Sequence, residues 1–85
     1  MRTERQHSID RAVARVLANC GDYLCPNNVL RAEVASVVVP PPSGSELDDS
    51  IKHLDASRCL VGVPAPTGTK WKLSDIGRAW HAENN

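Results

Sequence analysis

The sequence predicts a small α+β domain in which three helices are followed by a β-hairpin and a short last helix. Two observations carry this prediction. Residues 60–63 and 70–73 have strand-like composition and flank a segment containing Pro64, Pro66 and Gly68, which is typical of an exposed hairpin loop. Three stretches with helical periodicity precede the hairpin, and a fourth begins directly after it. We therefore expect helix, helix, helix, hairpin, helix.

Length and charge limit the possible organisation of the chain. A chain of 85 residues buries only about 60–65% of the surface that it exposes when unfolded, which leaves room for one core. We expect one domain over residues 8–82, a flexible tail at 1–7 and a short tail at 83–85. Ten acidic and ten basic side chains cancel, which argues against bulk electrostatic coating of nucleic acid. No apolar run approaches about 20 residues and no secretion signal opens the chain, so a soluble, cytoplasmic protein is expected.

The first helix has the clearest pattern. Ser8 is a suitable N-cap residue, and Gly21 suits a helix exit with positive φ. Between them, apolar residues recur at steps of three and four and form one face: Ile9, Ala12, Val13, Val16, Leu17 and Cys20.

The second helix is expected to begin at Pro26, because proline fits the first helical position. Tyr23 and Leu24 before it suit a short extended segment. Three prolines end the helix at 40–42. Its inward residues are predicted to be Val29, Leu30, Val34 and Val37.

The third helix follows a capping box, in which the Ser43 hydroxyl and the Glu46 side chain satisfy each other's backbone amides. Its buried stripe is predicted to be Leu47, Ile51 and Leu54, and it ends near Ser57 or Arg58.

The hairpin has two faces with different predicted surroundings. We expect Val61 and Val63 to point inward together with Trp71 and Leu73, while Lys70 and Lys72 point outward. Ser74 is the predicted cap of the last helix, in which one face is formed by Ile76, Ala79 and Trp80.

The segment Leu73-Ser74-Asp75-Ile76-Gly77-Arg78 follows the second hairpin strand. In that position it resembles the Leu-Ser/Thr-x-x-Gly-Arg segment of winged helix-turn-helix proteins, broadly of the MarR-like and PadR-like kind. The resemblance implies a DNA-binding module, such as a small transcriptional regulator, whose partner is double-stranded DNA. It also implies that residues 45–57 form the recognition helix and residues 64–70 the wing tip.

Candidate DNA-binding residues follow from that placement. In the third helix, Ser45, Lys52 and His53 can reach base edges without charge conflict, while phosphate contact is expected from Arg2 and Arg5 in the tail and from the wing. The wing candidates are Thr67, Thr69, Lys70 and Lys72. The two lysines also have an interpretation without DNA: solvated lysines on an exposed strand protect a sheet edge from pairing with another chain.

Acidic residues in the third helix oppose this interpretation. Asp48, Asp49 and Asp55, with Glu46 in the first turn, would face DNA phosphates. Two further roles are open to these carboxylates: they stabilise the positive end of the helix, or they read cytosine amines. An alternative function is a protein-interaction module that uses this acidic face, with Val38, Val39 or Trp80 exposed beside it.

Catalysis and metal binding are not expected. No nucleophile–base pattern and no glycine-rich phosphate loop occurs. Three sulfurs and one nitrogen could in principle bind a metal: Cys20, Cys25, Cys59 and His53. Their spacing lacks the close ligand pairs of structural zinc sites, so we expect the cysteines to be buried free thiols. We predict no enzyme activity, no cofactor and no metal.

Overall fold

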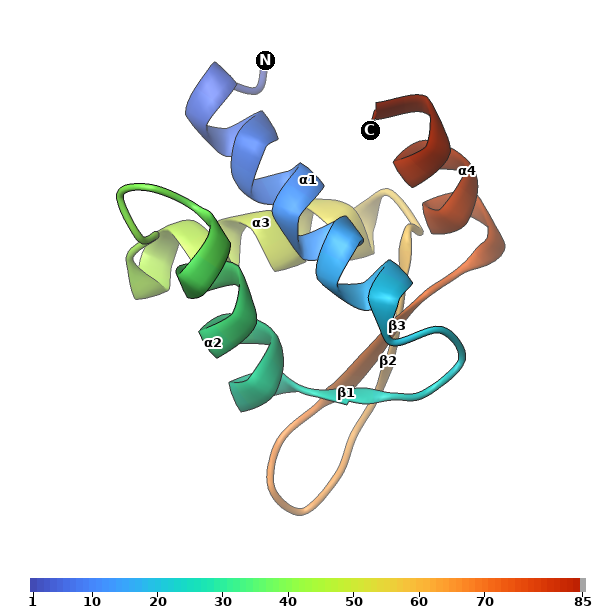
Figure 1. Ribbon diagram of the computed structural model, residues 1–85. Helices are drawn as coiled ribbons and strands as arrows, with labels where there is room; N and C mark the ends of the chain where they lie inside the picture. Colours follow the sequence, from blue (N-terminus) through green and yellow to red (C-terminus); the bar gives the residue numbers. More distant parts are fainter. Residues whose placement is uncertain (85) are drawn as a thin grey trace.

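The computed structural model describes residues 1–84 and has the predicted order of elements, with one additional short strand (Figure 1). Both ends of the described chain lie opposite the hairpin loop. The strands form an antiparallel sheet in the order β1-β3-β2. In chain order the elements are α1 (Glu4–Asn19), β1 (Cys25–Pro26), α2 (Asn27–Val37), α3 (Gly44–Ala56), β2 (Leu60–Val63), β3 (Lys70–Leu73) and α4 (Asp75–Asn84).

Helix α1 begins earlier than the sequence predicted. Thr3 is the N-cap: its hydroxyl accepts from the Gln6 amide at 3.0 Å, and the Gln6 side chain accepts from the Thr3 amide at 2.9 Å. The prediction that Ser8 caps this helix is therefore wrong, and residues 4–7 are helical rather than part of a flexible tail. At the other end, residues 83 and 84 belong to α4, while residue 85 lies outside the described residues.

The core forms where three helices meet the inner face of the sheet, with α1 crossing in front of α3 in Figure 1. Each element contributes apolar side chains at the spacing of its own periodicity. The largest buried contributions come from Ile9, Val13, Leu17, Leu30, Val34, Leu47, Ile51, Leu54, Leu60 and Leu73. Within residues 1–84, none of the helices has the length and apolar character needed to span a bilayer.

Two inward predictions for α2 are wrong. Val29 is exposed because the buried stripe of this helix runs through Leu30 and Val34, and Val29 in the first turn points to one side of that stripe. Val37 is the last residue of the helix and is 57% exposed, whereas the next residue, Val38, turns into the core.

The hairpin register corrects the prediction for its valines. Val61 pairs with Lys72 and Val63 with Lys70, and directly opposite residues of an antiparallel pair point to the same face. The two valines therefore share the outer face with the lysines and are exposed. The inner face is formed instead by Leu60, Trp71 and Leu73, so the prediction for the last two was right.

Trp71 connects the hairpin to the rest of the domain. Its ring lies over Gly62, where an added Cβ would come within 2.7 Å of the ring. Its Nε1 donates to the Asn27 side chain at 3.4 Å, and the Asn27 amide donates to the Thr69 carbonyl at 3.2 Å. Since Cys25 also pairs with Trp71, β1 and the start of α2 hold the base of the hairpin.

The junction between β3 and α4 explains why the Leu-Ser-x-x-Gly-Arg segment has serine and glycine at these positions. The Ser74 hydroxyl accepts from the Gly77 amide at 3.0 Å and donates to the Arg58 carbonyl at 2.5 Å, which confirms the predicted cap. A Cβ on Gly77 would lie 2.0 Å from the carbonyl oxygen of Cys59, so only glycine allows this approach. On the predicted face of α4, Ile76 is 54% exposed and Trp80 is half-buried.

Candidate nucleic-acid interface

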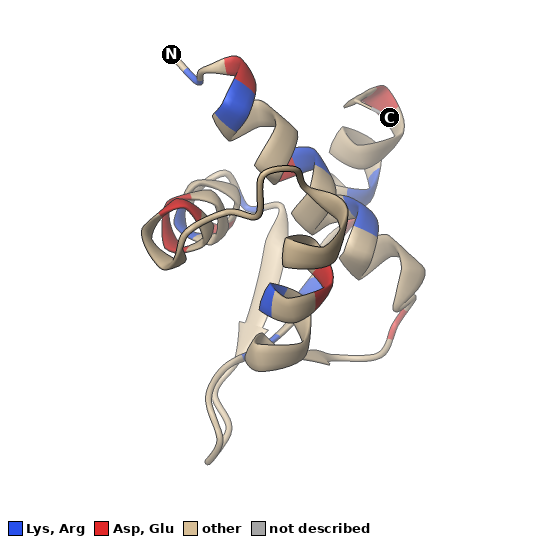
Figure 2. Cartoon of the chain, turned by 60° about the vertical axis from the view of Figure 1, so that its left-hand side comes forward, with Lys and Arg blue, Asp and Glu red and all other residues tan. Residues whose placement is uncertain are grey.

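Helix α3 presents one continuous stripe to solvent. Its buried side consists of Leu47, Ser50, Ile51 and Leu54. The opposite side has spacings of four, three and four residues and is exposed throughout: Ser45, Asp49, Lys52 and Ala56. In Figure 2, α3 is seen nearly end-on, and the hairpin loop extends below it on the same side of the molecule.

The hairpin loop forms the tip of the wing. The Gly68 amide donates to the Ala65 carbonyl at 3.0 Å, which closes a tight turn, and Gly68 has a φ of 113° that other residues rarely adopt. Residues 64–69 contain no charged side chain, as the uncoloured loop in Figure 2 shows. Charge on the wing therefore comes from Lys70 and Lys72 at its base.

Carboxylates in the first half of α3 are paired with arginines from the start of the chain and from α2. Glu46 contacts Arg5 at 3.0 Å, Asp48 contacts Arg31 at 2.6 Å, and Asp49 contacts Arg2 at 2.8 Å. Each pair neutralises a charge that the sequence suggested would oppose DNA. Arg2 and Arg5, for which the sequence predicted phosphate contacts, are bound to carboxylates of α3, because the early start of α1 directs both toward that helix.

The negative charge of Glu46 is stabilised by its hydrogen bonds, which lower its pKa. Hydrogen bonds from Arg5 and from the Ser43 amide lower the pKa of Glu46 to about 2. The carboxylate is thus ionised at neutral pH and compensated by a guanidinium. The same carboxylate closes the capping box that fixes the start of α3.

A buried carboxylate that sequence reasoning missed positions the same helix. Asp10 is 1% exposed and accepts two hydrogen bonds from Arg2, at 2.7 and 3.0 Å, and one from Ser50 at 2.6 Å. The bonds from Arg2 raise the pKa of its guanidinium. The spacing of Asp10 to Val13 and Leu17 on the inward face of α1 was the signal that could have found it.

Six lysine and arginine side chains within residues 1–84 have no carboxylate within ion-pair distance, and they fall into two groups. Arg11 and Arg15 lie on the outer side of α1, which packs on α3 by its other side. The second group lies along α3 and the hairpin: Lys52, Arg58, Lys70 and Lys72. Arg58 was missed by sequence reasoning; it follows α3 with a φ of 64°, and its side chain is exposed.

The predicted site residues differ in how far they are exposed to solvent. Ser45 and Lys52 lie on the outward stripe of α3, whereas His53 is half-buried on the flank that it shares with Glu46 and Ser50, toward α1. In the wing, Thr67 is exposed at the tip. Thr69 is half-buried, with its carbonyl bound by the Asn27 amide. Lys70 and Lys72 share the outer face of β3.

The acidic surface required by the protein-interaction alternative is reduced by the ion pairs. Of the three aspartates, Asp48 and Asp49 are paired, and Asp55 alone has no partner among the described residues. Val38 is buried and Val39 is exposed in the connection to α3. Trp80 is half-buried, and its ring meets His7 edge-on with centroids 5.9 Å apart.

The cysteines are free thiols, and two of the three, Cys25 and Cys59, are buried. Across residues 1–84, no group of three or more His, Cys, Asp or Glu side chains is arranged to hold a metal ion.

Three helices, a hairpin packed by its inner face, and an exposed third helix on the same side of the domain as the hairpin loop define the winged helix-turn-helix fold. The chain is similar in structure to F93 from STIV, a winged-helix DNA-binding protein, with a TM-score of 0.74 and 23% sequence identity. The similarity covers 86% of this chain and 78% of F93. It confirms the predicted fold. Comparisons of the sequence with protein families and with curated proteins found no match.

Proposed function

We propose that the protein is a non-enzymatic, cytoplasmic DNA-binding module that acts as a small transcriptional regulator. The observation that supports this function best concerns the exposed side of α3 and the wing, where, within residues 1–84, most negative charges are in ion pairs and the positive charges are not. Three of the four carboxylates of α3 are bound by Arg2, Arg5 and Arg31, and four cations are left without a carboxylate partner among the described residues. A surface of this kind attracts phosphate although the net charge of the chain is zero. F93, to which the chain is similar in structure, is a winged-helix DNA-binding protein, which agrees with this proposal.

Within this proposal, α3 enters the major groove by its outward stripe. Ser45 and Lys52 are the side chains that reach base edges, since serine donates or accepts and lysine donates to guanine. Asp49 lies on the same stripe, with its charge compensated by Arg2. We assign no base contact to His53, because it lies on the flank toward α1.

Phosphate contacts are assigned to Arg58 at the end of α3 and to Lys70 and Lys72 at the base of the wing. Such contacts fix the position of the protein on the duplex without reading its sequence. Thr67 at the wing tip and the backbone around Thr69 add uncharged hydrogen-bonding groups. Three phosphate contacts imply that log K falls with log salt at a slope of about −3.

The salt dependence of duplex binding tests this function. Fluorescence anisotropy of a labelled random duplex, measured at several salt concentrations, should show weak to moderate binding with a slope of about −3. Absence of binding at low salt would remove the proposal. Binding that does not change with salt would remove the assigned phosphate contacts.

A further inference from the structure

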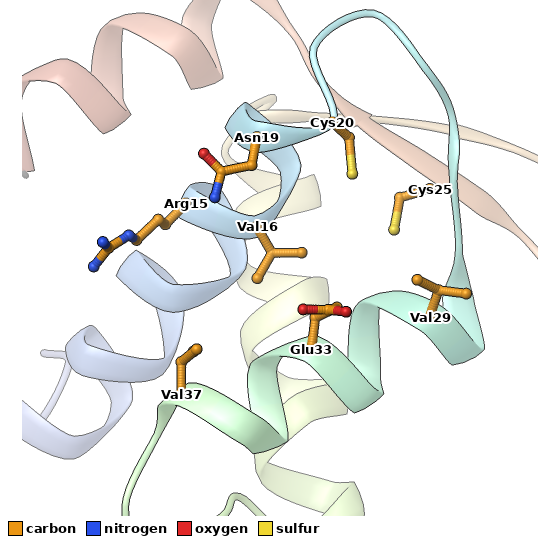
Figure 3. Close-up of a pocket in the computed structure, with 8 residues that line it drawn as sticks. All are labelled: Arg15, Val16, Asn19, Cys20, Cys25, Val29, Glu33 and Val37. Carbon is orange, nitrogen blue, oxygen red and sulfur yellow. The ribbon is translucent and has the colours of Figure 1, made fainter.

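A groove of about 410 Å³ lies between α1 and α2, away from the outward stripe of α3 (Figure 3). Val16 and Val29 form part of its walls, and Glu33 projects into it. At one end, Cys20 from the end of α1 and Cys25 from β1 direct both sulfur atoms into the groove. The proposed DNA-binding function uses neither thiol.

The two thiols are held close by the chain that joins them. Cys20 is the C-cap of α1, and only residues 21–24 separate it from Cys25. This loop is ordered: the Tyr23 amide donates to the Cys20 carbonyl at 3.2 Å, and Arg78 donates to Asp22 at 2.9 Å. Burial, followed by the charge of Cys20 and a hydrogen bond with it, raises the pKa of Cys25 to about 11.

We propose that Cys20 and Cys25 are an oxidation site that forms an intramolecular disulfide, with a small-molecule disulfide such as oxidised glutathione as the oxidant. Cys20 loses its proton and attacks one sulfur of the oxidant, forming a mixed disulfide and releasing one glutathione thiolate. Cys25 then loses its proton and attacks the Cys20 sulfur, which releases the second glutathione. The protein thus loses two protons and two electrons, and the oxidant becomes two thiols.

Accessibility sets this order and excludes the third cysteine. Cys20 is partly exposed at the groove, whereas Cys25 is 3% exposed and has a raised pKa, so Cys20 reacts first. Cys59, directly before β2, is 2% exposed, and burial raises its pKa as well. Its thiol is directed to the Ser57 carbonyl, at 3.9 Å, and it does not line the groove.

The disulfide would fasten α1 to the strand that holds the base of the wing. Cys25 pairs with Trp71 in the sheet, and Asn27 bonds both Trp71 and the Thr69 carbonyl. Opening of β1 away from β3 requires Cys25 to move relative to α1. A covalent link between the two removes that local opening, so the Asn27 amide should exchange its proton more slowly in the oxidised protein.

The test uses a glutathione buffer with an excess of oxidised glutathione, followed by thiol alkylation in denaturant and peptide mass mapping. We expect the wild type and Cys59→Ser to lose two hydrogens, to resist alkylation at both groove cysteines, and to stay monomeric on a non-reducing gel. Cys20→Ser, altered only at a partly exposed side chain, should retain alkylatable Cys25. Oxidation should also slow Asn27 amide exchange at least threefold.

Three results would overturn the proposal. The first is full alkylation of Cys20 and Cys25 in the oxidising buffer. The second is a stable glutathione adduct on Cys20 without closure to Cys25. The third is a product that depends on Cys59 or that links two chains. Each is read from folded wild type or a single serine variant, and none depends on whether the protein binds DNA.

Discussion

Single residues decide how closely the parts of this domain approach one another. Gly77 lets α4 lie against the carbonyl of Cys59, and Gly62 leaves room for the ring of Trp71. Asp10 accepts hydrogen bonds from both Arg2 and Ser50 inside the core. The sequence alone does not reveal either approach, because each depends on a residue that lies elsewhere along the chain.

Gly77→Ala should lower the free energy of unfolding by about 2–3 kcal/mol, since the added Cβ meets a backbone oxygen that cannot move aside. Urea unfolding followed by circular dichroism measures this loss. Gly44→Ala is the matched control: its nearest neighbour is the Arg31 side chain at 3.5 Å, and we expect stability to be unchanged or raised by up to about 1 kcal/mol. Equal effects of the two substitutions would contradict the assigned close contact.

At the scale of elements, α1 determines the position and the charge of α3. Arg2 and Arg5 at its start, with Arg31 from α2, bind the three carboxylates in the first half of α3. The Arg2–Asp10–Ser50 bonds add a buried connection between the same two helices. One segment of chain therefore orients the proposed recognition helix and neutralises part of its charge.

Asp10→Ala should destabilise the protein by about 3 kcal/mol, because it leaves a partly buried guanidinium and the buried Ser50 hydroxyl without their partner. Asp49→Ala removes the other carboxylate bound to Arg2, at the surface, and should cost less than about 1 kcal/mol. Thermal and urea unfolding of both variants compare the two effects. A loss at Asp49 as large as that at Asp10 would show that the buried connection is not the one that holds α3.

The elements themselves were largely predictable, and the errors have identifiable physical causes. Periodicity and capping patterns found all four helices and the hairpin strands of the described chain. Ser8 was chosen as a cap because the apolar pattern starts beside it, although Thr3 and Gln6 also have capping-box spacing. Val61 and Val63 were placed inward by residue type, but the register is set by Leu60 opposite Leu73. The sequence predicted a short extended segment at Tyr23 and Leu24 and a helix start at Pro26, whereas β1 comprises Cys25 and Pro26 and α2 begins at Asn27, because Pro26 is the N-cap.

At the scale of the whole molecule, the distribution of charge matters more than its sum. Sequence reasoning counted ten charges of each sign and identified the wing lysines, but side-chain pairing depends on how the helices cross. The acidic residues of α3 therefore argue less strongly against DNA binding, because three arginines from other parts of the chain are bound to them. Arg58 became a candidate only when its exposed position between α3 and β2 was known.

The most direct test compares two double variants that remove the same charge from opposite sides of the domain. Lys70→Gln/Lys72→Gln removes two proposed phosphate contacts and should reduce the magnitude of the salt slope of duplex binding by about 2. Arg11→Gln/Arg15→Gln removes two cations that have no carboxylate partner among the described residues, from the outer side of α1, and should leave the slope unchanged. Equal loss in both variants, or a larger loss in the α1 variant, would contradict DNA binding through α3 and the wing.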